Sequence, residues 1–595
     1  MKSVKGYLES VWFVLGYSFR FVPKSTYLMA ALYVVSGVLP YATAYLLGKL
    51  VNSIIAGASA HSYDQIWGTI VLYALFSTLP AILGNVQKYV NRHRMLTLQM
   101  EADLDWLHHR ERIDIAKYED PKFQDLLQRT TRNGLSPLYQ LTNAQFDMIR
   151  ALVGFVVGTI LSINFDFSIY LIVIVAAIPA FITDIKYAGG SWSIWAKDSP
   201  EQRRILSLRW YIINRIFLIE TKLLQSRDKL ISWIRKIYED FAHVQRKLEK
   251  SRVWQTSFSD TLSLLGFAIG IFLIVRNVID GGSSVGTLVY MMGTLTSVRS
   301  SIANLLEIVS GQYENHLIVK DFMEVVNTKS LIRESINPKS LNLTTAPEIV
   351  FEKVSFKYPN SDKWILKEID LTLKAGEKIG LVGNNGAGKT TLVKLLCRIY
   401  DPIEGRILVN GIDLQELSLK EWWSYLGVMF QEYTTYDFKV KDSIAISRSD
   451  KPLDLSEVKR AAEVSQAHTF IEDLKDRYEH QIGAEFGGIE PSKGQRQKLS
   501  IAKVVYRNAY LMILDEPTAS VDAEAEAKIF DSLENLSKNI SALLISHDFS
   551  TISQCDQIFV LDEGKLIESG NHKELMIKKG KYAELYNLQA GRFKK

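Results

Sequence analysis

The chain has 595 residues, which is too long for a single hydrophobic core and predicts several domains. Its 70 basic and 65 acidic residues leave a net charge of only +5, which gives no support for a nucleic-acid-binding protein. The two cysteines, Cys397 and Cys555, have neither a metal-ligand nor a C-x-x-C spacing, which fits a reducing compartment without disulfides. The mean hydropathy of +0.02 averages an apolar first half and an ordinary soluble second half, so the halves are read separately.

Residues 1–25 are predicted to form an amphipathic helix at the membrane interface. Residues 11–19 are a short apolar stretch, and Arg20 and Lys24 follow it where a cleaved signal peptide would carry small residues. An interfacial helix is therefore favoured over a secretory signal.

Residues 26–326 contain six apolar segments that suit membrane-spanning helices, since a helix needs about 20 residues to cross the hydrocarbon layer. The gaps after the second and fourth segments are long and rich in Lys and Arg, whereas the other gaps are short and nearly free of them. By the positive-inside rule, the N-terminus, the two long loops and the C-terminal half are cytoplasmic, in a multi-pass protein of the plasma (inner) membrane. The six segments lie near residues 27–48, 66–88, 148–163, 168–185, 257–279 and 285–309.

Both long loops have helical patterns and are predicted to extend the spanning helices into the cytoplasm. Residues 113–123 (IDIAKYEDPKF) interrupt the first loop, and residues 210–220 hold the corresponding position in the second. We expect these breaks to contact the soluble half, with a solvated turn as the alternative. In the sixth span, Arg299 and Glu307 are charged, which suggests either a functional or an intersubunit role.

Residues 327–346 are polar and are interpreted as a linker, and strand patterns begin in the following segment, residues 347–595. Residues 349–356 alternate in polarity, and residues 378–382 and 511–514 are compact apolar runs typical of buried parallel strands. The predicted fold is therefore multidomain, with a six-helix all-α transmembrane domain followed by an α/β domain.

A phosphate-binding loop follows the second of these strand patterns and opens onto a helical pattern. Its glycines let successive backbone N–H groups turn toward phosphates, Lys389 adds a cation, and the Thr390 hydroxyl suits Mg²⁺. The segment 347–595 is therefore a predicted nucleotide-binding domain that takes a nucleotide triphosphate and Mg²⁺. The loop reads Gly383, Asn384, Asn385, Gly386, Ala387, Gly388, Lys389, Thr390 and Thr391.

Further candidate residues follow the predicted strands. Tyr358 is expected to stack on the base, and Gln431 to contact Mg²⁺ and a water. Asp515 is expected to bind Mg²⁺ through water, while Glu516 orients or deprotonates the attacking water. His547 ends another apolar run and offers a hydrogen bond to the γ-phosphate.

With Asp522, this ordered series resembles that of ATP-binding-cassette (ABC) transporters, and specifically the exporter half-transporters that join six spans to one nucleotide-binding domain. Residues 118–128 and 430–449 look most like bacterial peptide exporters of the lantibiotic type. The resemblance implies an ATP hydrolase that exports a peptide or an amphiphilic compound by alternating access. An importer or a regulated channel on the same scaffold is the alternative, although an intact Glu516 argues against a channel.

The family signature LSGGQ appears here as PSKGQ, in which Lys493 replaces a glycine. The family implies that two nucleotide-binding domains hold two ATP molecules between them, so the expected partner is a second copy or a related half-transporter. A homodimer with two altered sites and a heterodimer with one degenerate site both stay open. The signature residues expected to contact ATP are Ser492, Lys493, Gly494 and Gln495.

Overall fold

The fold is seen in a computed structural model that describes residues 2–63, 66–187, 200–332, 334–359, 361–517, 528–529, 531–532, 540–546 and 548–593. The chain divides into two compact units. Unit 1 comprises Met1–Arg112 and Asp125–Thr328, and unit 2 comprises Ile113–Gln124 and Lys329–Lys595. The sequence candidates Asp522 and His547 lie outside the described residues.

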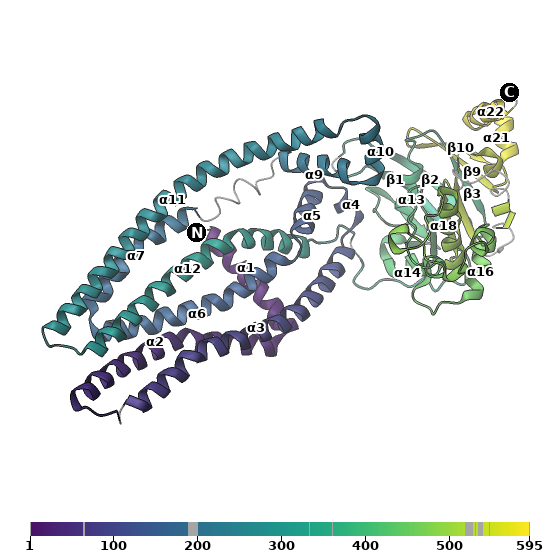
Figure 1. Ribbon diagram of the computed structural model, residues 1–595. Helices are drawn as coiled ribbons and strands as arrows, with labels where there is room; N and C mark the ends of the chain where they lie inside the picture. Colours follow the sequence, from purple (N-terminus) through teal and green to yellow (C-terminus); the bar gives the residue numbers. More distant parts are fainter. Residues whose placement is uncertain are drawn as a thin grey trace. The chain divides into compact units, whose positions relative to one another are not determined.

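Unit 1 is helical throughout its described part (Figure 1). Helix α7 packs against α11, α6 against α12, and α2 against both α3 and α12. The helices are α1 (Lys2–Phe21), α2 (Pro23–Ala60), α3 (Ile66–Glu111), α5 (Pro121–Asn133), α6 (Ser136–Phe165), α7 (Phe167–Tyr187), α9 (Pro200–Ile213), α10 (Arg215–Leu223), α11 (Arg227–Ile279) and α12 (Val285–Val326).

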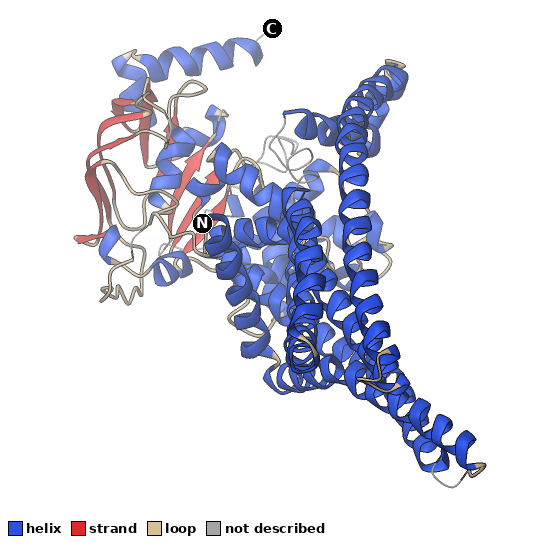
Figure 2. Cartoon of the chain, turned by 90° about the vertical axis from the view of Figure 1, so that its left-hand side faces the viewer, coloured by secondary structure: helices blue, strands red, loops and turns tan. Residues whose placement is uncertain are grey.

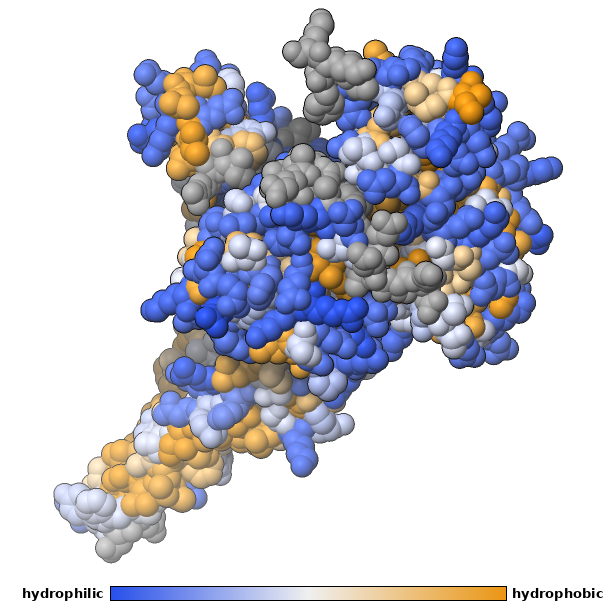
Figure 3. Space-filling model, turned by 90° about the vertical axis from the view of Figure 1, so that its right-hand side faces the viewer, coloured by the Kyte–Doolittle hydropathy of each residue, from blue (hydrophilic) through white to orange (hydrophobic). Residues whose placement is uncertain are grey.

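The long helices of unit 1 coincide with the predicted spans, which fall on α2, α3, α6, α7, α11 and α12. Among the described residues, α2, α3, α6 and α11 are long and apolar enough to cross a membrane, and α7 contributes the shorter apolar segment Phe167–Ala180. The elongated helical part of the surface is mainly hydrophobic in Figure 3. Helix α11 has 53 residues, so it extends far beyond the roughly 20 residues that a span needs.

Helix α1 packs one face on unit 1 and exposes the other. Tyr17 lies edge-on to Phe322 of α12, whose ring stacks on Trp106 of α3 with centroids 4.4 Å apart. Leu8 and Trp12 are exposed on the opposite side. This division into two faces fits the predicted amphipathic helix.

Unit 2 contains two sheets, drawn in red in Figure 2. The smaller sheet is antiparallel, with strand order β2-β1-β4-β5, and comprises β1 (Ile349–Phe356), β2 (Leu366–Leu373), β4 (Glu404–Val409) and β5 (Ile412–Asp413). The larger has the order β10-β9-β3-β8-β7-β6 and is parallel except for β10. Its strands are β3 (Lys378–Val382), β6 (Leu426–Met429), β7 (Leu511–Asp515), β8 (Ser541–Ile545), β9 (Gln557–Asp562) and β10 (Lys565–Gly570).

The larger sheet explains why the candidate residues gather at one edge. Strands β3, β6, β7 and β8 are parallel neighbours, so their carboxyl ends point the same way. Ligands of open parallel sheets bind at that edge. The helices around both sheets are α13 (Lys389–Leu396), α14 (Leu419–Ser424), α15 (Val440–Ala445), α16 (Leu455–Val464), α17 (His468–Glu472), α18 (Lys493–Arg507), α20 (Phe549–Ile552), α21 (His572–Lys578) and α22 (Lys581–Phe593).

The break in the first long loop belongs to unit 2. Its short helix α4 (Ile115–Tyr118) buries Ala116 in the same core as β1 and β2. Asp114 accepts hydrogen bonds from Ser330 Oγ at 2.9 Å and from Ile332 N at 3.2 Å. The predicted contact between this break and the soluble half is therefore confirmed.

The break in the second long loop lies at Asn214, between α9 and α10, and belongs to unit 1. Its predicted contact with a soluble domain stays a prediction.

Candidate nucleotide-binding site

The phosphate-binding loop joins β3 to α13, and its glycines are required by geometry at two positions. Gly388 has φ +108°, and a Cβ there would lie 3.1 Å from Ile365 O. A Cβ on Gly383 would lie 2.1 Å from Leu561 O, which is shorter than any real contact. A larger residue at either position would displace the backbone of the loop.

Lys389, the first residue of α13, is buried with its ammonium bent back over the loop. Its Nζ donates to Gly383 O at 2.8 Å and to Asn384 O at 3.2 Å. Burial lowers the pKa of Lys389, and the nearby Glu516 and Asp515 act in the opposite direction. The loop therefore holds a partly desolvated cation beside two carboxylates.

Thr390 and Asp515 face each other across the loop. Thr390 Oγ1 donates to Asp515 Oδ2 at 2.9 Å, and Asp515, at the end of β7, is only 2% exposed. A hydroxyl and a carboxylate are hard oxygen donors of the kind that Mg²⁺ prefers. The donor set therefore fits this ion.

Glu516 lies one residue further along the chain, and its carboxylate is half-buried. Gln431 Nε2 donates to Glu516 Oε2 at 2.9 Å. The structure thus brings together the predicted catalytic carboxylate and the amide that follows strand β6.

Tyr358 lines the site beside α13. Its hydroxyl lies 3.0 Å from Thr391 Oγ1, and its ring packs edge-on against Phe356 and Tyr400. A cavity of about 500 Å³ joins this aromatic ring to the loop and the carboxylates, within the range of ordinary ligand pockets. Its lining residues are Tyr358, Ile365, Asn385, Gly386, Gly388, Lys389, Thr390, Thr391, Gln431, Asp515 and Glu516.

The signature residues lie at the start of α18 and do not line this cavity. Ser492 is the N-cap: its Oγ accepts from Gln495 N at 3.3 Å, and its own N donates to Gln495 Oε1 at 2.9 Å. Lys493, which replaces a glycine of the family signature, is exposed in this chain. The PSKGQ sequence therefore forms a regular, capped helix start.

Sequence reasoning did not single out Gln497, Lys394 or Tyr400, although each contacts a candidate residue. Gln497 Nε2 donates to Glu516 O at 3.3 Å. Lys394 lies over the Tyr358 ring, 5.2 Å from its centroid. One signal was available: Gln497 is a polar residue that shares the buried face of its helix with Ile501 and Val504, and buried polar residues usually have a partner.

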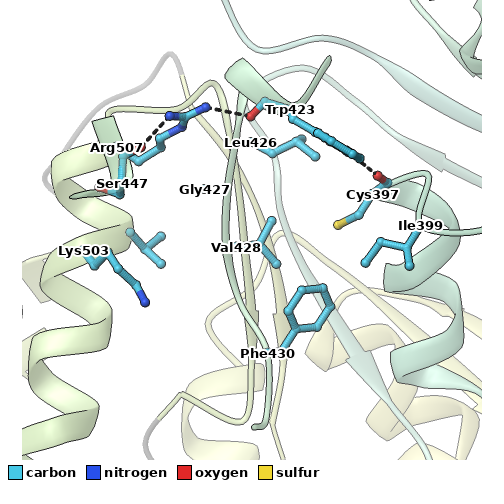
Figure 4. Close-up of a pocket in the computed structure, with 11 residues that line it drawn as sticks. Cys397, Ile399, Trp423, Leu426, Gly427, Val428, Phe430, Ser447, Lys503 and Arg507 are labelled. Atoms are coloured by element: carbon cyan, nitrogen blue, oxygen red, sulfur yellow. Dashed lines mark hydrogen bonds between the residues drawn. The ribbon is translucent and has the colours of Figure 1, made fainter. Parts of the chain in front are cut away.

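A second cavity in unit 2, of about 370 Å³, lies between α18 and strand β6. In Figure 4, Val428 and Phe430 lie between Lys503 of α18 and Ile399, which follows α13. Arg507 Nη2 at its rim donates to Trp423 O at 3.0 Å. We call this apolar cavity with basic residues at its edge the α18 groove.

Comparison with known proteins agrees with this geometry. A family model described as ABC transporter matches residues 366–519. The subtilin transport ATP-binding protein SpaT of Bacillus subtilis is 25% identical, over 91% of this chain and 88% of its own length. The nisin transport ATP-binding protein NisT of Lactococcus lactis subsp. lactis is 21% identical, over 93% and 91%. A solved bacterial Atm1-family ABC exporter with ATP bound shares the fold, with TM-score 0.80, 21% identity, and coverage of 95% of this chain and 99% of the other.

Residues 366–519 therefore match the ABC transporter family, and the site in this segment supports an ATP hydrolase whose turnover is coupled to transport. The chain as a whole has the fold of an ABC exporter, and its relatives over most of its length are named for subtilin transport, nisin transport and leukotoxin export.

Proposed function

We propose that the chain is an ATP-driven export pump that moves a peptide or an amphiphilic compound from the cytoplasm across the plasma membrane. The main support for ATP hydrolysis is the cavity that is lined by the phosphate loop, Glu516 and Gln431. Support for the cargo comes from SpaT and NisT, whose names specify subtilin and nisin transport, and from LtxB of Aggregatibacter actinomycetemcomitans, named for leukotoxin export.

A transport assay tests this proposal. The chain in inside-out vesicles is expected to accumulate a labelled amphiphilic peptide only when hydrolysable ATP is supplied outside. Accumulation that proceeds equally with a non-hydrolysable analogue would contradict an ATP-driven pump. No accumulation of the peptide, together with transport of a small amphiphile, would exclude a peptide cargo.

The residues of the site have distinct proposed roles. Thr390, Asp515 and Gln431 would hold Mg²⁺, which neutralises phosphate charge when it is bound. Lys389 would bind the phosphates, and Glu516 would orient the attacking water and take its proton. Roles for His547 and Asp522 stay predictions from the sequence.

Exporter half-transporters of this class generally dimerise. We propose that two nucleotide-binding units meet around two ATP molecules, with the start of α18 from one chain facing the ATP of the other. A second copy and a related half-transporter are both compatible with the exposed, capped PSKGQ segment. The membrane unit would have its N-terminus and unit 2 on the cytoplasmic side.

Glu119 gives the first long loop a direct connection to the nucleotide site. Its carboxylate accepts from Lys394 Nζ at 3.2 Å and from the Tyr400 hydroxyl. The Lys394 ammonium lies over the ring of Tyr358. We propose that this ion pair transmits ATP binding to the loop.

Replacing Glu119 by Gln tests this connection. We expect stimulation of ATP turnover by cargo to fall about 1.4- to fivefold, since a partly exposed ion pair contributes roughly 0.2–1 kcal/mol. The measurement is the ratio of stimulated to basal phosphate release. Asp120→Asn is the control, because the Asp120 carboxylate accepts from Lys122 N at 3.0 Å within the same loop. Equal ratios in both variants would contradict the role of Glu119.

The α18 groove suits the second long loop of another copy. Helix α10 exposes Phe217, Ile219 and Leu223, which match the apolar groove, while Glu220 of the same helix complements the basic rim.

The pair Ile219→Cys and Ile399→Cys is expected to give a disulfide-linked product of twice the chain mass. Native Cys397 does not interfere, because burial raises the pKa of its thiol to about 12.

Val244→Cys combined with Ile399→Cys is the matched control for the crosslink, since Val244 is exposed on α11. Equal yields from the two pairs would mean random collision and would exclude this docking.

A further inference from the structure

Glu516 has an unusual backbone for a residue with a side chain. Its φ is +53°, in the left-handed region that L-amino acids rarely adopt. Such conformations persist at functional sites only when the surrounding contacts fix them. The contacts that hold Glu516 are therefore part of the machinery that aims its carboxylate.

Three hydrogen bonds hold Glu516 from different parts of the fold. Its N–H donates to Ile545 O on β8 at 2.8 Å. Its carbonyl accepts from Gln497 Nε2 on α18 at 3.3 Å, and its carboxylate accepts from Gln431 Nε2 at 2.9 Å. Gln497 is 1% exposed, so its amide donates in a desolvated position. A side chain thus fixes the peptide unit directly after the left-handed residue.

Helix α18 is also bound to the segment that follows Gln431. The Tyr433 hydroxyl donates to Lys493 O at 3.1 Å, and Lys503 Nζ donates to Thr434 O at 2.7 Å. The two amides that contact Glu516, those of Gln497 and Gln431, are therefore carried by elements that are joined to each other. A shift of α18 moves both.

We propose that Gln497 is a positioning residue that sets the backbone of Glu516 and so aims its carboxylate for ATP hydrolysis. The inference rests on the proposed role of Glu516. Because α18 begins at the signature, Gln497 also connects Ser492 and Lys493 to the carboxylate of the same chain. The start of α18 and the catalytic carboxylate then respond together to any displacement of this helix.

The test compares the Gln497→Met and Gln497→Glu variants with the wild-type chain, each as the intact transporter in lipid. Methionine keeps the length without a donor, and a glutamate carboxylate places charge against the Glu516 carbonyl. We expect kcat to fall about tenfold in Gln497→Met, the size of effect that one buried hydrogen bond supports, and further in Gln497→Glu. The KM for ATP is expected to stay within about twofold, because Gln497 does not line the nucleotide cavity.

Ser500→Ala is the matched control, since Ser500 lies buried on the same helix and its Oγ has no hydrogen-bond partner among the described residues. It is expected to keep the wild-type kcat. Thermal unfolding of every variant separates misfolding from mispositioning. A Gln497→Met variant with wild-type kcat would overturn the inference, as would a parallel rise in KM with unchanged kcat. Turnover that survives in Glu516→Gln would instead refute the proposed role of Glu516 itself.

Discussion

We expect the purified chain to hydrolyse ATP by itself in lipid, and Glu516→Gln to lower this turnover at least about 100-fold. The physical reason is that an amide cannot take a proton from the attacking water. The substitution keeps the size of the side chain and an oxygen that can accept from Gln431. ATP binding is therefore expected to persist while phosphate release is lost.

Phosphate release at saturating MgATP measures this effect, and Glu432→Gln is the control because Glu432 is an exposed neighbour of the site in sequence. Turnover by the chain alone would support a homodimer in which PSKGQ is a working signature. Negligible turnover by well-folded protein would point to a partner subunit or to obligate stimulation by cargo. The homodimer would then have to be withdrawn.

The second large effect is expected from Lys389→Met, which removes the buried ammonium and keeps an apolar stem. Charge-assisted hydrogen bonds contribute roughly 1.5–3 kcal/mol each, so the affinity for ATP should fall about 10- to 100-fold. Loss of the cation also leaves Asp515 and Glu516 without their nearby positive charge, which disfavours an incoming triphosphate.

Equilibrium binding of labelled ATP measures this loss, in a Glu516→Gln background so that turnover does not intervene. Lys367→Met, an exposed lysine on β2, controls for the general loss of one positive charge. Equal affinities of the two variants would show that the loop cavity is not where the triphosphate binds.

Local sequence patterns were sufficient for much of the soluble half. The strand predicted at residues 378–382 is β3, and the run at 511–514 is β7 with Asp515 added at its end. These elements can be predicted because strand burial and the glycine-rich turn depend on a few consecutive residues. The loop, the two carboxylates and Gln431 could therefore be named before their common cavity was seen.

The spans of the membrane half were predicted from a different kind of pattern. Long apolar segments and the distribution of Lys and Arg predict spans and their orientation, because the bilayer acts as a uniform solvent along each helix. The pattern is weaker where α12 carries Arg299 and Glu307, since polar residues on one face reduce the apolar signal of a helix.

The contacts of Gln497 and Glu119 could not be predicted from the sequence and are seen only in the folded structure. Gln497 reaches Glu516 across 19 positions, and Glu119 reaches Lys394 across 275. No periodicity encodes such pairs, because they depend on where packing places separate elements. The sequence therefore specifies the residues that are proposed to act on ATP. Packing in three dimensions specifies which residues contact Glu516 and which contacts join the first long loop to Tyr358.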